Sequence, residues 1–329
     1  MRSSNAAMKS RSHTQSLRFT GLFLFPFLVS SIACQGRASH SLPSIVHAET
    51  TEAPAAPVPS STIAPVRYEA FKVQGRKSVA ELESRLGPER FATLLKINRV
   101  DKSHIRNGDM LFIPTGDFEL IVLSPFPAQL EVVRSVNKLI LVSRRSQAFA
   151  AYESGNLVRW GPTSTGKKST PTPAGLYHTN WKARETRSTV NSSWKLPWCF
   201  NLDNRAGVSF HQFDLPGYPA SHGCVRLLEE DARWIYGWAE PWMLSKTNGS
   251  LVAYGTPVVI FDDYSHGEKA PWKRLDTDPH ATIVSVAQIE ETLSQYMQSI
   301  LGRARQREAL IGQLLKPGDD LQTRTQSQD

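Results

Sequence analysis

The sequence has little cysteine and no long hydrophobic span. Its 329 residues contain only Cys34, Cys199 and Cys224, which excludes a disulfide-stapled scaffold and requires a separate explanation for each thiol. The apolar run at residues 19–29 is interrupted by Pro26. It is shorter than the roughly 20 apolar residues that a membrane helix needs, so it is not expected to span a bilayer.

Basic runs interleaved with aromatic residues are also missing. The formal net charge is +8, from 38 Lys and Arg against 30 Asp and Glu, and much of the excess lies in the N-terminal segment and the C-terminal tail. This distribution argues against nucleic acid as a partner. A hydrophobic fraction of 40% with eight Trp supplies a globular core, and the length suggests two domains plus processing segments.

The N-terminus has the order of an export signal. Basic residues precede the apolar run, and the small residues Ser31 and Ala33 stand just before Cys34, which predicts a signal peptide at 1–34. The same stretch resembles a lipobox, so the alternatives are a secreted protein and a lipoprotein lipidated at Cys34. Residues 35–66, rich in Pro, Ala, Ser and Thr, predict a disordered linker. The expected location is the periplasm or cell envelope.

Residues 67–116 predict a small βααβ module. Its expected elements are a strand at 68–73, a helix at 78–86 with Ser78 as N-cap, a helix at 91–97 and a strand at 110–113. This order, with Leu-Leu-Lys-Ile-Asn at 94–98 and Asn-Gly-Asp-Met-Leu-Phe-Ile-Pro at 107–114, resembles a LysM module. The resemblance implies binding to the glycan of peptidoglycan; the alternative is a spacer without affinity for sugar.

The rest of the chain predicts a mainly β domain at 136–263, reached through a connector at 117–135. Short apolar runs separated by turn residues favour a sandwich or barrel, with a surface helix at 228–238. Expected strands lie at 119–123, 139–142, 148–152, 157–160, 176–179, 208–211, 223–227 and 257–261. In the tail at 264–329, apolar residues recur with a helical period from 286 to 314 and predict one long amphipathic helix packed on the β domain or a second copy.

The segment Ser-His-Gly-Cys-Val-Arg-Leu at 221–227 carries the chemistry. On an extended strand His222 and Cys224 would point to the same face, so the imidazole could take the thiol proton and leave a nucleophilic thiolate. The backbone N–H groups of Gly223 and Cys224 are candidate donors to an oxyanion, and Arg226 could bind a substrate carboxylate.

Two other interpretations of this segment stay open from the residues alone. A free cysteine is often only a small buried hydrophobe, as Cys199 is expected to be. Alternatively His211, His222 and Cys224, with His178, could hold zinc, although no CxxC or HExxH spacing supports a metal site.

The 221–227 segment, the upstream His211, and the blocks Ser-Thr-Gly-Lys at 164–167 and Thr-Pro-Ala-Gly at 172–175 closely resemble the catalytic domain of L,D-transpeptidases. The resemblance implies that Cys224 is the nucleophile, His222 the base and His211 a second histidine of the pocket. It implies that Ser221 and Arg226 orient the substrate, and that no metal or organic cofactor is needed.

The implied reaction is acyl transfer on the tetrapeptide stems of peptidoglycan through a thioester. An amine of another stem would give 3-3 cross-links, a protein lysine an attached envelope protein, and water a carboxypeptidase or hydrolase. A wall-binding protein without activity is the alternative from another class. Gln212 replaces the usual Gly and the loop from His211 to Ser221 is short, which leaves the acceptor side open, as is the oligomeric state. Trp194 and Trp198 are expected either in a wall of the cleft or in the core.

Overall fold

A computed structural model describes residues 66–116, 119–314, 323–325 and 327–328. The predicted signal segment with Cys34, and the predicted linker up to residue 65, lie outside these described residues. Within the described part of the chain, no helix combines the length and the apolar character that crossing a membrane requires.

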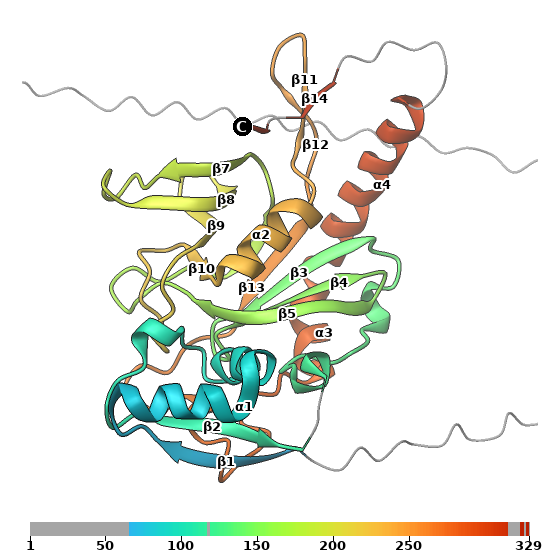
Figure 1. The fold of residues 1–329 in the computed structure, drawn as a ribbon. Helices are drawn as coiled ribbons and strands as arrows, with labels where there is room; N and C mark the ends of the chain where they lie inside the picture. The colour runs from blue at the N-terminus through green and yellow to red at the C-terminus, as the bar shows by residue number, and fades with distance from the viewer. Residues whose placement is uncertain (1–65, 117–118, 315–322, 326, 329) are drawn as a thin grey trace, which may run out of the picture. The chain divides into compact units, whose positions relative to one another are not determined.

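The N-terminal module has one antiparallel strand pair and a helical segment between the two strands (Figure 1). Strand β1 (Arg67–Lys72) pairs with β2 (Met110–Thr115) along its whole length. Helix α1 (Gly75–Ile97) and the 3-10 helix η1 (Lys102–His104) connect them. The apolar sides of α1 and β2 close over a small core of their own, so the module folds around its own hydrophobic cluster.

The two helices predicted in this module form one kinked helical segment. Gly87 has a φ of 75°, and the following Pro88 has no N–H to donate, so the helix bends between them. The prediction of Ser78 as N-cap is wrong, because the helix begins at Gly75. The Ser78 hydroxyl instead donates to the Gly75 carbonyl at 2.9 Å and accepts from the Gln74 N–H at 2.8 Å.

The connector contains two 3-10 turns, η2 (Leu120–Leu123) and η3 (Glu131–Val133). The strand predicted at 119–123 is therefore wrong: a short apolar run does not distinguish a strand from a helical turn. The Nε1 of Trp160 donates to the Leu120 carbonyl at 2.6 Å, which fixes η2 against the β domain.

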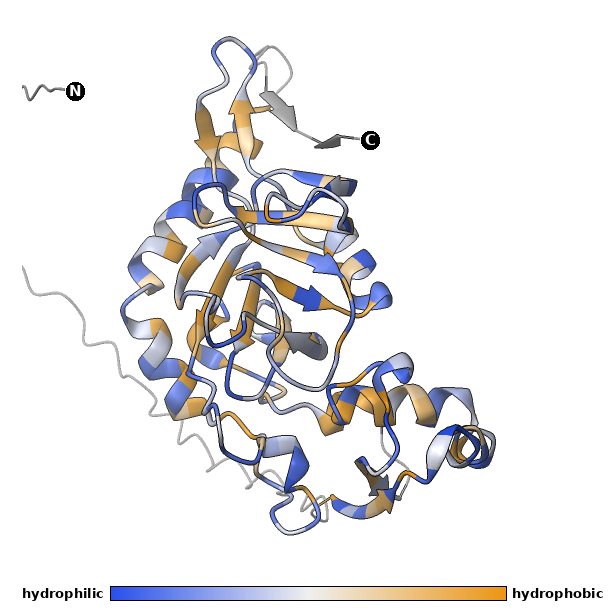
Figure 2. Ribbon diagram, turned by 90° about the vertical axis from the view of Figure 1, so that its left-hand side faces the viewer, coloured by the Kyte–Doolittle hydropathy of each residue, from blue (hydrophilic) through white to orange (hydrophobic). Residues whose placement is uncertain are grey.

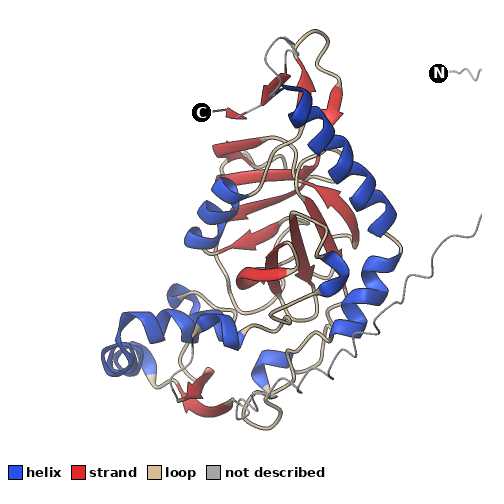
Figure 3. Ribbon diagram, turned by 90° about the vertical axis from the view of Figure 1, so that its right-hand side faces the viewer, coloured by secondary structure: helices blue, strands red, loops and turns tan. Residues whose placement is uncertain are grey.

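One curled ten-stranded sheet forms the β domain (Figure 3). Its order is β15-β7-β8-β9-β10-β5-β4-β3-β13-β6. Neighbours are antiparallel except at three pairs, β9 with β10, β3 with β13, and β7 with β15. The strands are β3 (Lys138–Ser143), β4 (Ala148–Glu153), β5 (Asn156–Ser164), β6 (Gly175–His178), β7 (Lys182–Arg187), β8 (Lys195–Asp203), β9 (Val208–Gln212), β10 (Val225–Leu227), β13 (Pro257–Phe261) and β15 (Ser327–Gln328).

Both faces of the central strands are buried, which explains their near-continuous apolar sequence. On β3, Leu139 and Leu141 join one hydrophobic cluster while Ile140 and Val142 join the other. Figure 2 shows the hydrophobic colour on these inner strands and mixed colour on the helices that cover them. Helix α2 (Glu229–Trp238) covers the second face.

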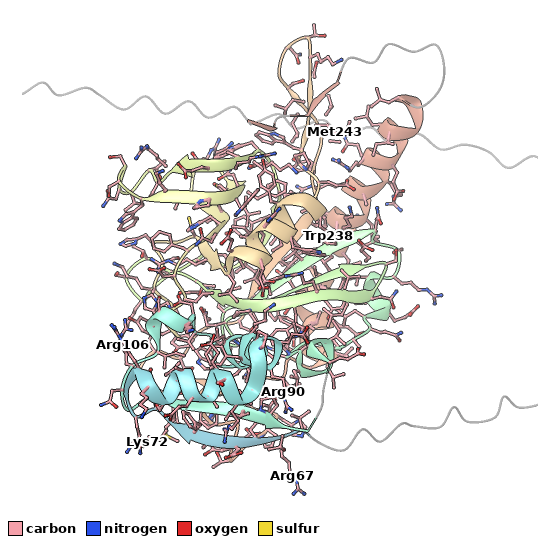
Figure 4. The ribbon with its side chains drawn as sticks, viewed as in Figure 1. Arg67, Lys72, Arg90, Arg106, Trp238 and Met243 are labelled. Atoms are coloured by element: carbon pink, nitrogen blue, oxygen red, sulfur yellow. The ribbon has the colours of Figure 1, made fainter. Side chains whose placement is uncertain are left out.

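Polar and cation–π contacts hold α2 to the sheet. Trp238, labelled on α2 in Figure 4, donates from Nε1 to Glu153 at 2.5 Å. The Lys138 ammonium lies 5.4 Å from the centroid of the Trp238 ring. Beyond α2, a small sheet has the order β12-β11-β14 and contains β11 (Met243–Ser245), β12 (Leu251–Ala253) and β14 (Thr323–Thr325).

The tail forms two helices where the sequence predicts one. After the 3-10 turn η4 (Pro271–Lys273), α3 (Val286–Ser294) and α4 (Met297–Leu314) are separated by a break at 295–296. The Ser285 hydroxyl caps α3 by accepting from the Gln288 N–H. Ile289, Leu293 and Ile300 lie in the first hydrophobic cluster, so the start of the tail packs on the β domain.

The end of α1 is fastened to the β domain by buried charged groups. The Lys96 ammonium lies 2.6 Å from Glu230 and 3.6 Å from the fully buried Asp231, both at the start of α2. Arg99, 2% exposed, donates from Nε to the Ser146 carbonyl at 2.9 Å. These polar contacts join an apolar one, because Ile97 and Phe112 of the module belong to the first hydrophobic cluster of the β domain.

Candidate active site

The thiol and the four side chains predicted to act with it line one cleft. This cleft of about 370 Å³ is bordered by the β7–β8 hairpin, by β8 and β9, and by the segment at 221–226. Its lining includes five of the residues singled out from the sequence, namely His211, Ser221, His222, Cys224 and Arg226. The buried His211 of β9 and the segment at 221–226 therefore meet at the predicted reaction centre.

The thiol of Cys224 lies at the cleft wall, partly exposed. Its Sγ is 3.2 Å from the Gly207 carbonyl oxygen and 3.3 Å from the Ser209 hydroxyl. The predicted strand at 223–227 begins only at Val225, because Gly223 has a φ of 114°, in the region that favours glycine. The extended-strand argument for Cys224 is thus wrong, and a turn presents the thiol.

His222 makes its polar contact with a lysine and none with the thiol. Its Nε2 lies 3.0 Å from the Lys167 ammonium, while its Nδ1 is buried and has no hydrogen-bond partner among the described residues. The Trp194 ring packs against the imidazole at 5.2 Å between centroids. Burial first, then the charges of Lys167 and Arg226, lower the pKa of His222. The predicted proton acceptor is therefore neutral and held by a lysine.

The Ser221 hydroxyl closes the turn that carries the thiol. It donates to the Cys224 carbonyl at 2.5 Å and accepts from the Gly223 N–H at 3.1 Å. The Gly223 N–H, one of the two predicted oxyanion donors, donates to the Ser221 hydroxyl in this structure. Of the two predicted donors, the Cys224 N–H remains for a developing negative charge.

The two Gly- and Pro-containing blocks form the scaffold under this turn. The Lys167 N–H donates to the Ser221 carbonyl at 3.0 Å, and the Thr172 hydroxyl to the Cys224 carbonyl at 3.3 Å. Gly166 makes the close approach between the blocks: a Cβ there would lie 2.2 Å from the Thr170 carbonyl oxygen. Glycine is therefore required at this position.

His211 and Arg226 occupy paired positions on β9 and β10. His211 is buried and its Nδ1 lies 3.0 Å from the Gln212 carbonyl. Burial lowers the pKa of His211 to about 4 despite that hydrogen bond, with a further lowering from Arg226, so this imidazole is neutral. The Arg226 guanidinium lies 4.6 Å from the Phe213 ring centroid and reaches the Asp214 carbonyl at 3.4 Å.

The two tryptophans and the second thiol have separate places. Trp194 lines the cleft, whereas Trp198 packs edge-on against Tyr236 of α2 at 5.5 Å. Cys199 is free and 1% exposed, and burial raises the pKa of its thiol to about 12, despite a hydrogen bond from Ser209. Sequence reasoning missed Ser209, which contacts both thiols, because a serine on an apolar strand carries no signal by itself.

The zinc alternative does not fit the arrangement. Among the described residues, one group of three His, Cys, Asp or Glu side chains has donor atoms within 4.8 Å of one another: Asp101, His104 and Asp214. It contains no member of the proposed zinc set. His178 lies instead on β6 with its Nδ1 3.1 Å from Arg303 of α4.

The loop between His211 and Ser221 contacts the N-terminal module, which the sequence analysis did not predict. The Asp101 N–H donates to the Leu215 carbonyl at 2.9 Å, and the Leu215 N–H donates back to the Asp101 carboxylate at 2.7 Å. Leu215 is fully buried, and Val100 forms an antiparallel bridge with Pro216. One wall of the cleft is therefore supported by the module.

Comparison with known proteins points to the same part of the chain. Residues 137–260 match the family model of the L,D-transpeptidase catalytic domain. This segment contains Cys224, His222 and the two scaffold blocks. No curated protein matches the sequence significantly.

Solved structures of L,D-transpeptidases are similar over parts of the chain. The Stackebrandtia nassauensis enzyme is 22% identical, with 39% of this chain and 57% of that chain covered and a TM-score of 0.32. L,D-transpeptidase 1 of Mycobacterium tuberculosis is 24% identical, with 38% and 62% covered and a TM-score of 0.29. The Xylanimonas cellulosilytica protein is 19% identical, with 59% and 98% covered and a TM-score of 0.36. The chain thus spans less than two thirds of the first two structures.

Proposed function

We propose that this protein is a cysteine-dependent L,D-transpeptidase that acts on the tetrapeptide stems of peptidoglycan. The observation that carries the proposal is the meeting of Cys224, His222 and Arg226 in one cleft, inside the segment that matches the catalytic-domain family. A nucleophile and a neutral base are parts that acyl transfer on a peptide requires, and Arg226 supplies a cation that can bind a substrate carboxylate.

In the proposed reaction the Cys224 sulfur attacks the carbonyl of the third stem residue. Its proton passes to His222, and the Cys224 N–H stabilises the oxyanion. Collapse of this intermediate breaks the peptide bond, the leaving D-Ala amine takes the proton from His222, and a thioester remains. An incoming amine then attacks the thioester carbonyl and loses a proton to His222. The C–S bond breaks, and the Cys224 thiolate recovers that proton as the new amide forms. Hydrogen bonds between catalytic groups often form only with substrate bound, so this route does not need a His222–Cys224 hydrogen bond in the ligand-free protein.

The acceptor decides the product. We propose an amine, either on a neighbouring stem to give a 3-3 cross-link or on an envelope protein to attach it to the wall. Incubation of the protein with labelled muropeptides, followed by mass analysis, separates cross-linked dimers and protein adducts from trimmed stems. Trimmed stems alone would identify the protein as a carboxypeptidase or hydrolase.

The nucleophile is tested by intact-mass measurement after incubation with a tetrapeptide stem or a carbapenem. The wild-type chain is expected to gain one acyl group, and Cys224→Ala none. The matched control is Cys199→Ala, which removes the other free thiol of the described chain and should still be acylated. Acylation of the Cys224→Ala variant would contradict the assignment.

We further propose that the protein is exported to the periplasm or cell envelope, with Cys34 as a lipid anchor, and that the module at 67–116 binds peptidoglycan glycan. Sedimentation with purified sacculi tests the binding, and labelling with a radioactive fatty acid tests Cys34 against Cys34→Ala. A protein whose wall function persists fully in Cys224→Ser would be a binder and no enzyme.

A further inference from the structure

Lys167 makes an unusual contact with the predicted base. Its Nζ lies 3.0 Å from Nε2 of His222. The position is set by the backbone, since the Lys167 N–H donates to the Ser221 carbonyl and Gly166 bridges to Ser221. None of the ion pairs among the described residues includes Lys167, so its ammonium is not neutralised by a carboxylate of that part of the chain.

This contact dictates where the imidazole carries its proton. An ammonium has three donors and no acceptor, whereas a neutral imidazole has one N–H and one lone pair. With Lys167 charged, Nε2 of His222 must accept, and the ring proton must lie on Nδ1. The ring has no second lone pair. While the contact lasts, His222 has no nitrogen free to take the proton of Cys224.

Electrostatics favour the same neutral state. Desolvation, Lys167 and Arg226 all disfavour the imidazolium form, which must appear when the thiol is deprotonated. A carboxylate that binds Lys167 would remove both obstacles, because it frees the lone pair and neutralises the nearby charge. Lys167 is only partly buried beside the cleft, so a ligand can reach it.

We propose that Lys167 is a specificity-determining residue that recognises a donor stem with a free carboxylate. Without substrate, the Lys167 ammonium donates to the lone pair of His222. When the stem binds, its carboxylate pairs with Lys167, and the imidazole becomes free to act as the base. The thiol proton of Cys224 then moves to the freed ring, which becomes an imidazolium beside the new thiolate. That the ligand is a stem carboxylate rests on the proposed function. That Lys167 blocks the lone pair of His222 does not, and this block is called the restraint of the base. The enzyme thereby discriminates stems with free carboxylates from amidated stems.

The first test needs no peptidoglycan. The rate at which iodoacetamide alkylates Cys224 at pH 7 is followed by peptide mass mapping in the wild type, Lys167→Met, Lys167→Arg and the control Lys168→Met. Releasing a charge-assisted hydrogen bond is expected to speed alkylation about tenfold or more in Lys167→Met. Lys167→Arg, which still donates, and Lys168→Met, an exposed neighbour, should stay near the wild-type rate. Alkylation of Lys167→Met at or below that rate would overturn the proposal.

Two further measurements test the proposal even if Lys167→Met folds poorly: the first uses only the wild type, and the second compares two substrates on the same protein. Nitrogen-15 NMR of the wild-type His222 ring should place the proton on Nδ1, and a proton on Nε2 would refute the restraint. With tetrapeptide stems, the wild type should prefer free carboxylates over amidated ones in kcat/KM, and Lys167→Met should lose most of that preference while Lys168→Met keeps it. If no stem acylates Cys224 but Lys167→Met is alkylated faster, the proposed function fails and the restraint stands.

Discussion

Replacing Asp101 by alanine should loosen the contact between the module and the cleft loop. The Asp101 carboxylate accepts from the Leu215 N–H at 2.7 Å, and it caps η1 by accepting from the His104 N–H at 3.1 Å. Leu215 is fully buried, so its N–H would be left without an acceptor, which costs about 1–3 kcal/mol. Loss of the cap adds about 1 kcal/mol. The expected fall in the free energy of unfolding is therefore about 2–4 kcal/mol.

The assay is urea unfolding followed by tryptophan fluorescence, with Asp109→Ala as the matched control. Asp109 lies in the same module and accepts from the Arg106 N–H at 2.7 Å, but that contact is exposed and stays within its own turn. The control should lose less than about 1 kcal/mol. Equal losses in Asp101→Ala and Asp109→Ala would refute the view that the bond to Leu215 joins the two parts of the structure.

Glycine contacts and buried imidazoles give two further predictions. Gly166→Ala should lower the free energy of unfolding by more than about 2 kcal/mol and abolish acylation, because its Cβ would meet backbone atoms at 2.2–2.6 Å. The control Gly237→Ala, on α2 with no atom near its Cβ, should raise the free energy of unfolding by about 0.5–1 kcal/mol in a thermal melt. The pKa values of His211 and His178, about 4 and about 3, lie below the 6.5 of unfolded histidine. Keeping these imidazoles neutral therefore costs nothing above pH 6.5, and the free energy of unfolding falls progressively below pH 6.5 until the folded pKa is passed; for His211 the total loss is about 3 kcal/mol. Urea midpoints between pH 7 and 4 should fall less steeply in His211→Gln, and an unchanged slope would contradict the assignment.

Most strands of the β domain were predictable from the sequence, including the edge strand β6, but the β7–β8 hairpin was not. The buried strands around Leu141 and Ala150 are apolar on both faces, so their runs stand out against the flanking turns. Strand β7 has the sequence Lys-Ala-Arg-Glu-Thr-Arg and buries only Ala183, so apolar and polar residues do not alternate along it. Hydrophobic periodicity carries no signal for such a strand. The break between α3 and α4 was also not predicted, because no Gly or Pro stands there to indicate the end of a helix.

The members of the site were predictable, but their contacts were not. A spacing of two residues suggested that His222 and Cys224 share a face, and the motif located both. The positive φ of Gly223 and the bond from Lys167 to the imidazole depend on a loop that is 55 residues away in sequence. Such long-range contacts follow from the packing of the two scaffold blocks, which one sequence cannot reveal.

The loop at 211–221 is held by the docked module. Leu215 exchanges two hydrogen bonds with Asp101, and Pro216 bridges to Val100. This loop borders the side of the cleft where the acceptor is expected to enter. Loosening it should therefore impair capture of the amine more than formation of the thioester. In Asp101→Ala we expect the ratio of cross-linked or attached product to hydrolysed stem to fall several-fold, with acylation by a carbapenem nearly unchanged. An equal loss in both steps would mean that the module supports the fold alone.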